Sequence, residues 1–263
     1  MIGTPQKEDV TVTTSSETVT VSYPETGSIT ITASAPGTYT VHVGENVYTA
    51  VIETAGGSDT VTVPKLPVGS YDVSVTAPET DEYFALDTGK IATYTVTQGT
   101  VTVTSANVTV TYPDTGSVTI TASLAGEYTV KVGDKTYTAT ITEDGGSANV
   151  PVELLDVGDY GISVSGSAGD NYYPIDTGII NYYHVLAGSI TVTGQGTTVT
   201  YPDKGTIVIT TDVAGAYTIK VGDKTYENVE LIAGTNDFNV PDVFNANDYD
   251  VKVSANIANY NAI

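Results

Sequence analysis

The triplet Asp-Thr-Gly occurs twice in this chain, beginning at Asp87 and at Asp176. In aspartic proteases this triplet carries the catalytic carboxylate, and two such carboxylates face each other and share one proton. The two copies are 89 residues apart, at the same place in two consecutive repeats, so we expect them to lie one domain apart. The residues that follow, Lys90 and Ile179, also differ from the Ser or Ala of those proteases. The triplets therefore predict glycine-containing loops and no protease site.

Further acidic side chains stand close to these triplets. Asp81 precedes Asp87 by six residues, and Asp170 precedes Asp176 by the same distance. Calcium prefers several oxygen ligands on a flexible loop, so these four carboxylates are calcium candidates near a domain junction. The spacing matches no known calcium loop, and the third repeat has Ala258 in place of the first acid. Ordinary capped turns are the favoured interpretation.

Tyrosine and histidine side chains are the remaining candidates for a binding site. Of the 19 Tyr, all but Tyr173 and Tyr182 recur at equivalent positions of the repeats, which is typical of packing positions. Strand alternation places Tyr183 and Val185 in the core, so Tyr182 and His184 are expected to face solvent side by side. We predict that Tyr173, Tyr182 and His184 form a ligand-binding patch. Packing against the adjoining domain is the alternative.

Composition excludes several functional classes. Nine basic and 31 acidic residues give a net charge of −22, and an evenly acidic surface repels nucleic acid and anionic lipid. The chain has two His and no Cys, and no Ser–His–acid set or cluster of metal ligands recurs, so we expect no catalytic site and no cofactor. No apolar run is long enough to insert into a membrane. Residues 1–5 lack the basic and apolar regions of a signal peptide.

The chain repeats itself with a period of 89 residues. Tyr23-Pro24 recurs as Tyr112-Pro113 and again as Tyr201-Pro202. A unit of this length is large enough to close its own core, which predicts three domains of one type. We expect them at residues 1–98, with 1–9 as an N-terminal extension, at 99–187 and at 188–263. The third is expected to lack its last strand.

Each repeat has the pattern of a strand-rich domain. Val, Ile or Tyr alternates with Thr or Ser along most of the chain, which is typical of strands with one solvent face. Threonine suits this pattern because it is β-branched and its hydroxyl tolerates water. No segment has convincing helical periodicity. The strands expected in the first repeat are residues 10–13, 18–23, 28–34, 38–43, 47–52, 59–63, 71–76 and 91–97.

The turns and strand count indicate the type of sandwich. Gly44, like its repeats Gly133 and Gly222, stands between two alternating runs, as in a two-residue hairpin loop that needs a positive φ. The pattern Gly-x-Tyr-x-Val-x-Val around Tyr71 resembles a tyrosine corner. The prediction is an all-β fold of three tandem immunoglobulin-like β-sandwich domains in a row. Two-residue linkers predict a stiff row with about 35–40 Å per domain.

Three sequence features resemble one known family. The turn Tyr-Pro-(Glu/Asp)-Thr-Gly, the Gly-x-Tyr-x-Val-x-Val strand and the loop 169–172 are similar to bacterial-type Ig-like repeat domains of cell-surface adhesin-like proteins, found in methanogenic archaea and some bacteria. The resemblance covers the chain from Val10 onward. It implies an extracellular, cell-surface fragment of a larger secreted or wall-anchored protein.

That resemblance leads to a functional hypothesis. We expect a non-enzymatic, semi-rigid stalk or spacer in cell attachment, monomeric in solution, whose partner is a glycan or protein of a host or partner cell, bound by regions outside this fragment. Asn107 begins the one Asn-x-Ser/Thr sequon of the chain, so it is a glycosylation candidate.

Two alternative functions stay open. In the first alternative, the repeats are themselves carbohydrate- or protein-binding modules. In the second, the chain is a strand-exchanging fibre subunit, because the counterpart of residues 91–97 in the third repeat would lie beyond Ile263 and leave an open sheet edge. Residues 10–21 would then be the donor. The simpler interpretation is that the fragment ends before this strand.

Overall fold

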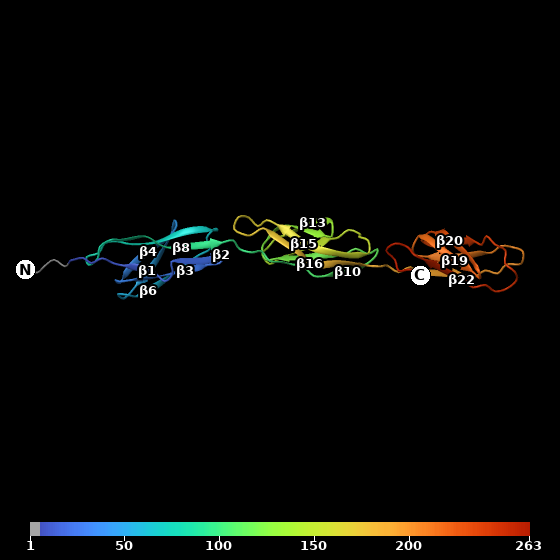
Figure 1. Ribbon diagram of the computed structural model, residues 1–263, viewed down its shortest axis with the longest axis horizontal. Coiled ribbons are helices and arrows are strands. Elements are labelled where there is room, and N and C mark those ends of the chain that lie inside the picture. Colours follow the sequence, from blue (N-terminus) through green and yellow to red (C-terminus); the bar gives the residue numbers. More distant parts are fainter. Residues whose placement is uncertain (1–5) are drawn as a thin grey trace, which may run out of the picture.

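A computed structural model describes residues 6–263, and its regular structure consists of β-strands. Three β-sandwiches follow one another in a row (Figure 1). Each sandwich has its own apolar core, which extends from Val12 to Val96 in the first, from Val118 to Val185 in the second and from Ile190 to Ala255 in the third. The fold is therefore all-β, with immunoglobulin-like sandwiches in tandem. The first five residues of the expected N-terminal extension lie outside the described residues.

The first repeat forms two sheets. A five-stranded sheet has the order β2-β8-β7-β4-β5, and a three-stranded sheet has the order β1-β3-β6. Within the larger sheet, β2 and β8 run parallel, whereas the other neighbours are antiparallel. The strands are β1 (Val12–Thr14), β2 (Thr18–Ser22), β3 (Gly27–Ala33), β4 (Gly37–Val43), β5 (Asn46–Ile52), β6 (Ser58–Val63), β7 (Gly69–Ala77) and β8 (Leu86–Thr97).

The second repeat has the same two sheets. Their orders are β10-β16-β15-β12-β13 and β14-β11-β9, with β10 and β16 parallel. The strands are β9 (Val103–Thr104), β10 (Val108–Thr111), β11 (Ser117–Ala122), β12 (Gly126–Val132), β13 (Lys135–Ile141), β14 (Ser147–Pro151), β15 (Gly158–Gly166) and β16 (Ile175–Leu186).

The third repeat differs in its larger sheet. Three strands, in the order β20-β19-β22, stand where the other repeats have five, and the second sheet is β17-β18-β21. Within the described residues, no strand corresponds to β8 or β16, and residues 196–200, which follow β17, have no strand assignment. The strands are β17 (Val192–Gln195), β18 (Thr206–Thr211), β19 (Gly215–Val221), β20 (Lys224–Leu231), β21 (Gly234–Asn239) and β22 (Val251–Ala255).

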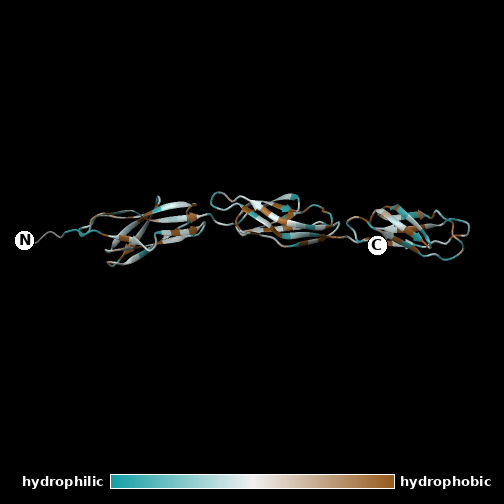
Figure 2. Cartoon of the chain, viewed as in Figure 1, coloured by the Kyte–Doolittle hydropathy of each residue, from teal (hydrophilic) through white to brown (hydrophobic). Residues whose placement is uncertain are grey.

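The alternation in sequence explains why these strands form. Val41 and Val43 on β4 are buried, and the residues between and beside them point outward. Outward hydroxyls pair across neighbouring strands, as between Thr30 and Thr60, whose Oγ1 atoms are 2.7 Å apart. Figure 2 shows the resulting mixture of apolar and polar residues along each strand. Alternate burial of this kind places one apolar face of each sheet against the other.

The expected tyrosine corner is present. The Tyr71 hydroxyl donates a hydrogen bond of 2.7 Å to the Pro67 carbonyl, and Tyr160 repeats this bond to the Asp156 carbonyl at 2.8 Å. Gly44 has a φ of +57°, and a Cβ there would lie 2.9 Å from the Tyr71 ring. Glycine at this hairpin therefore serves both the turn and the close approach of the corner tyrosine.

Two sequence expectations need correction. Strand β8 begins at Leu86 rather than at Ile91, so the first Asp-Thr-Gly triplet lies inside a strand and not in a loop. The proposed donor segment, residues 10–21, belongs to its own repeat, because β1 pairs with β3 and β2 pairs with β8. A strand already held in this way is not free to complete another sandwich.

Buried tyrosines predict how the fold responds to alkali. Burial raises the pKa of Tyr94 and Tyr128, and burial together with a hydrogen bond to Asp242 raises the pKa of Tyr226 to about 12. These groups stabilise the folded state fully below their unfolded pKa of about 10, and this contribution is lost as the pH rises through the folded values. We expect the phenolate absorbance of these three tyrosines to appear only as the β-sheet circular dichroism disappears. A single ionisation step with unchanged circular dichroism would contradict this.

Candidate functional site

The Asp-Thr-Gly triplets form β-bulges. The Thr88 Oγ1 atom accepts a hydrogen bond of 2.8 Å from the Val75 N–H, and Gly89 has a φ of +59°. The Asp87 carboxylate accepts the Gly89 N–H at 3.0 Å. The register between β7 and β8 shifts at this point, as expected for a bulge with a left-handed glycine.

The second triplet repeats this arrangement in the second sandwich. Val164 donates its N–H to Thr177 Oγ1 at 2.8 Å, and Gly178 has a φ of +58°. The Asp176 carboxylate accepts the Gly178 N–H at 3.2 Å. Each carboxylate thus bonds to its own backbone, in a separate domain. The two therefore do not form a proton-sharing pair.

The calcium candidates are divided between bulges and end loops. Asp87 and Asp176 lie in the bulges of β8 and β16, whereas Asp81 and Asp170 lie in the loops that precede these strands. Between Gln6 and Ile263, no group of three His, Cys, Asp or Glu is placed to hold a metal ion. Calcium binding therefore stays a prediction from the sequence, and main-chain oxygens would have to supply part of the coordination.

Two of the three predicted binding residues lie together. The rings of Tyr182 and His184 stack with their centroids 6.0 Å apart, and His184 Nδ1 lies 2.6 Å from the Asp159 carboxylate. Tyr182 is 43% exposed. Tyr173 instead lies in the loop before β16, where its N–H donates to the Gly99 carbonyl. Tyr182 follows nine positions later, and an extended chain of that length spans about 30 Å.

Besides Tyr182 and His184, the outward face of β16 has an apolar residue that the sequence analysis missed. Leu186 follows Tyr182 and His184 at the same spacing and is 52% exposed. We call these three residues the β16 strip. At the equivalent positions of β8, the first repeat has threonines, namely Thr93, Thr95 and Thr97. Comparing the repeats at these positions would have revealed the strip.

The sequon asparagine lies beside the β16 strip. Asn107 is exposed, and its Oδ1 atom accepts the Tyr182 N–H at 2.9 Å. Its amide nitrogen, to which a glycan would be attached, takes no part in this bond. Glycosylation of Asn107 stays a prediction, and a glycan there would stand next to the strip.

The first junction joins repeats one and two through an aromatic contact and several hydrogen bonds. The rings of Tyr23 and Tyr172 meet edge to face, with centroids 5.1 Å apart and an interplanar angle of 89°. The Val68 N–H donates to Asn171 Oδ1 at 2.9 Å. The linker residue Gly99 donates its N–H to the Asn171 carbonyl at 3.0 Å. Side chains and main chain of the second repeat thus hold the end of the first.

The second junction repeats these contacts. Tyr112 and Tyr260 meet edge to face with centroids 5.3 Å apart, and the Val157 N–H donates to Asn259 Oδ1 at 2.8 Å. Gly188 donates its N–H to the Asn259 carbonyl at 2.9 Å. Burial raises the pKa of Tyr260, as it does for Tyr172 at the first junction. Two independent copies of one geometry indicate a built interface.

The sequence patterns predict capped turns at the Asn-Tyr loops and turns between strands at the Tyr-Pro pairs, and they do not predict contact between the two. The residues involved are Asn171-Tyr172 and Asn259-Tyr260 in the loops. Their recurrence close to a two-residue linker was the available signal. Each loop contacts the tyrosine of the Tyr-Pro turn in the preceding repeat.

The fold and its junctions define the class: tandem immunoglobulin-like β-sandwich modules joined by short, packed linkers. No protein-family model matches the chain, and no curated protein matches it. Within residues 6–263 there is no helix that would cross a membrane.

Three solved structures are similar to the chain. Fibronectin(III)-like modules of CbhA from Clostridium thermocellum match with a TM-score of 0.27 and 15% identity, over 66% of this chain and 94% of that one. The titin domains z1z2 in complex with telethonin give 0.37 and 13%, over 66% and 95%. The I9–I11 tandem from titin gives 0.28 and 10%, over 96% of both chains. The assignment of the fold rests on the sheets described above.

The bulge glycines predict a position-specific loss of stability. Gly178→Ala should destabilise the second repeat by about 1–2 kcal/mol, because the site has open space but a left-handed backbone. Gly166→Ala is the matched control, since it lies in the same repeat without a positive φ and a Cβ there would meet its nearest atom at 3.5 Å. Denaturant unfolding measures both. Equal stability of the two variants would refute the bulge assignment.

Proposed function

We propose that this chain is a non-enzymatic segment of a cell-surface adhesin-like protein that acts as a semi-rigid spacer in cell attachment. The observation that carries the proposal is the pair of matching junctions. A spacer must transmit position from one end to the other, and this requires that neighbouring domains do not swing freely. The resemblance of the repeats to adhesin-like modules supports an extracellular location.

The contacts at each junction limit bending between domains. An edge-to-face tyrosine pair contributes about 0.5–1.5 kcal/mol beyond its buried area. A hydrogen bond such as Val68 N–H to Asn171 Oδ1 contributes about the same net amount. A hinge motion at the first junction would break both contacts together, so the extended arrangement holds most of the population.

Charge supports the same function. The net charge is −22 over 263 residues, and the basic residues are nine lysines. Neighbouring copies of the chain therefore repel one another. Mutual repulsion favours separate, outstretched chains on a crowded surface. It also disfavours lateral association of the sandwiches.

A second function is favoured by one specific observation, the β16 strip. Three apolar or aromatic side chains replace the threonines of the first repeat on the outward face of the sheet. Stacked Tyr182 and His184 offer a flat aromatic surface to a sugar ring or to an apolar side chain. On this alternative, the second repeat binds a carbohydrate or a protein of a partner cell directly.

The spacer proposal predicts a rod that one junction variant loosens. We expect small-angle X-ray scattering of the native chain to give a narrow distribution with a maximum dimension of about 110 Å, the sum of three domain lengths. Asn171→Ala combined with Tyr172→Ala should broaden this distribution toward shorter dimensions. Tyr173→Ala is the control, since it removes a neighbouring side chain but keeps the backbone bond to Gly99. A native chain as flexible as the double variant would overturn the proposal.

The binding alternative predicts the effect of restoring the residues of the first repeat. The triple variant Tyr182→Thr, His184→Thr and Leu186→Thr should fold normally, because β8 carries threonine at these positions. If the strip binds, affinity in glycan-array or cell-binding assays should fall about tenfold or more. Tyr173→Ala, measured separately, reports whether the third predicted residue contributes. Binding that survives the triple variant would exclude the strip.

A further inference from the structure

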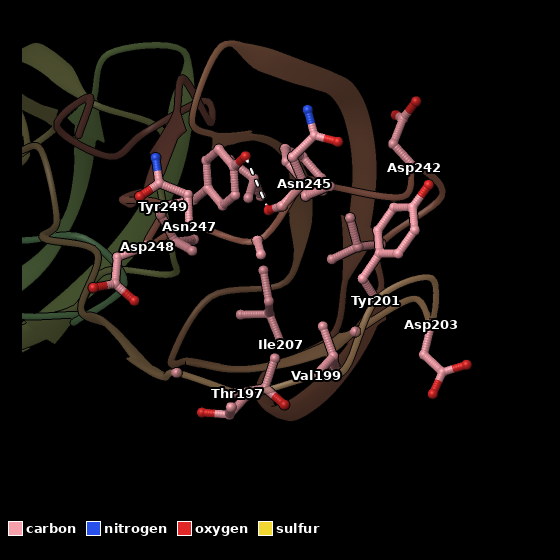
Figure 3. A pocket seen from close by; sticks show the side chains of 18 residues that line it. Thr197, Val199, Tyr201, Asp203, Ile207, Asp242, Asn245, Asn247, Asp248 and Tyr249 are labelled. Atoms are coloured by element: carbon pink, nitrogen blue, oxygen red, sulfur yellow. Dashed lines mark hydrogen bonds between the residues drawn. The ribbon is translucent and has the colours of Figure 1, made fainter.

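The third repeat has an open groove, lined by both apolar and polar side chains, at the edge of its larger sheet. Figure 3 shows Ile207 between Val199 on one side and the hydrogen-bonded pair Tyr249 and Asn245 on the other. The groove has a volume of about 510 Å³. Its rim carries acidic side chains, among them Asp248.

In the complete repeats, a strand covers this place. Val251 is 40% exposed, whereas its equivalents Val73 on β7 and Ile162 on β15 are 1% and 0% exposed. These two residues are covered by the strands β8 and β16, which lie alongside them in the sheet. The groove of the third repeat therefore has the lining of a strand site.

The groove also keeps a site for a tyrosine. In the second repeat, the Gly116 N–H donates to the hydroxyl of Tyr183 on β16 at 2.8 Å. In the first repeat, a Cβ on Gly27 would lie 2.3 Å from the hydroxyl of Tyr94 on β8. Glycine thus makes room for this tyrosine, and Gly205 stands at the same position of the third repeat.

Both backbone edges of the groove are open along most of their length in the described part of the chain. Strand β22 pairs with β19 on one side, and on its other side only Ala255 is bonded, through two main-chain hydrogen bonds with Ile263. Residues 196–200 pair with no strand. In the second repeat, the corresponding strands β15 and β10 both pair with β16. Strand β22 is also shorter than β15. Residues 247–250 are equivalent to the first four residues of β15, but they have no strand assignment, because no strand in the place of β16 pairs with them.

One ion pair indicates which strand the groove prefers. In the first repeat, Lys90 of β8 lies 2.6 Å from Asp72. In the second repeat, Gly161 stands in place of the aspartate and Ile179 in place of the lysine. A Cβ on Gly161 would lie 2.8 Å from the Ile179 side chain, so the two replacements fit each other. The third repeat has the acid of the first repeat, Asp250, at this position.

We propose that the groove of the third repeat binds an extended peptide segment with the pattern Lys-x-x-x-Tyr-x-Val. The segment lies parallel to residues 196–200 and antiparallel to β22, as β8 lies against β2 and β7. Its tyrosine packs against Gly205 and its lysine pairs with Asp250. Its valine lies opposite Asn247, as Val96 lies opposite Gly69. The residue two after the lysine lies opposite Val251, as Ala92 lies opposite Val73. A second copy of this chain is the poorer occupant, because it would have to withdraw a strand whose Tyr94 is fully buried.

The test uses the full chain and a labelled synthetic peptide with residues 87–97 of β8, since Ile263 already holds the place of Leu86 beside Ala255. We expect saturable one-to-one binding. Hydrogen exchange should slow at β22 and at residues 196–200, and not in the first two repeats. A peptide with Tyr94→Thr should bind at least tenfold more weakly, since it lacks the ring that fills the groove.

The corresponding peptide of β16, residues 176–186, tests the ion pair. It should bind about threefold more weakly than the β8 peptide at low salt, with the difference vanishing at high salt, because an exposed ion pair is weak and screened. Asp250→Ser in the full chain should remove this preference without unfolding the third repeat.

Three outcomes would overturn the inference. One is that the β8 peptide does not bind a chain whose third repeat is shown by hydrogen exchange to be folded. Another is equal binding of a scrambled peptide. The third is concentration-dependent self-association, seen by light scattering, that the peptide inhibits, which would identify a second copy as the occupant. The rod dimensions that test the spacer proposal are measured at concentrations where the chain is monomeric, so they do not depend on these outcomes.

Discussion

The linker glycines allow a closer approach of two domains than any side chain would permit. A Cβ on Gly99 would lie 2.1 Å from the Tyr23 carbonyl oxygen, and one on Gly188 would lie 2.4 Å from that of Tyr112. No L-residue other than glycine fits against a backbone atom at such distances. Because the linker passes so close to the Tyr-Pro turn, the loop of the next domain reaches the tyrosine ring. The straight arrangement of the three sandwiches depends on this approach (Figure 1).

Most of the fold follows from the sequence, because period-two alternation decides which face of a strand is buried. The expected strand at 38–43 is observed as β4, and the corner at Tyr71 follows from its pattern with glycine and valine. The bulge at Gly89 was not foreseen, because glycine with a positive φ serves a turn and a bulge equally well. Only the pairing of Val75 with Thr88 decides between them. That pairing is a property of two strands, not of one segment.

The candidate sites were harder to foresee, for reasons of distance. Val68 and Asn171 are 103 residues apart in sequence, and no local pattern connects them. Tyr173 and Tyr182 look close in sequence, but an extended strand carries them to different parts of one domain. By contrast, Tyr182 and His184 were placed correctly, because residues two apart on one strand share a face.

The parallel pairing of β2 with β8 has a mechanical consequence. Strand β2, near the start of the first repeat, lies beside β8, the last strand of that repeat, and runs in the same direction. Tension between the ends of these two strands therefore slides them past each other, and their evenly spaced hydrogen bonds share the load rather than opening one at a time. The second repeat resists a pull through β10 and β16 in the same way. In the third repeat, the strands that the structure describes contain no such pair, so its resistance to force depends on what lies in its groove.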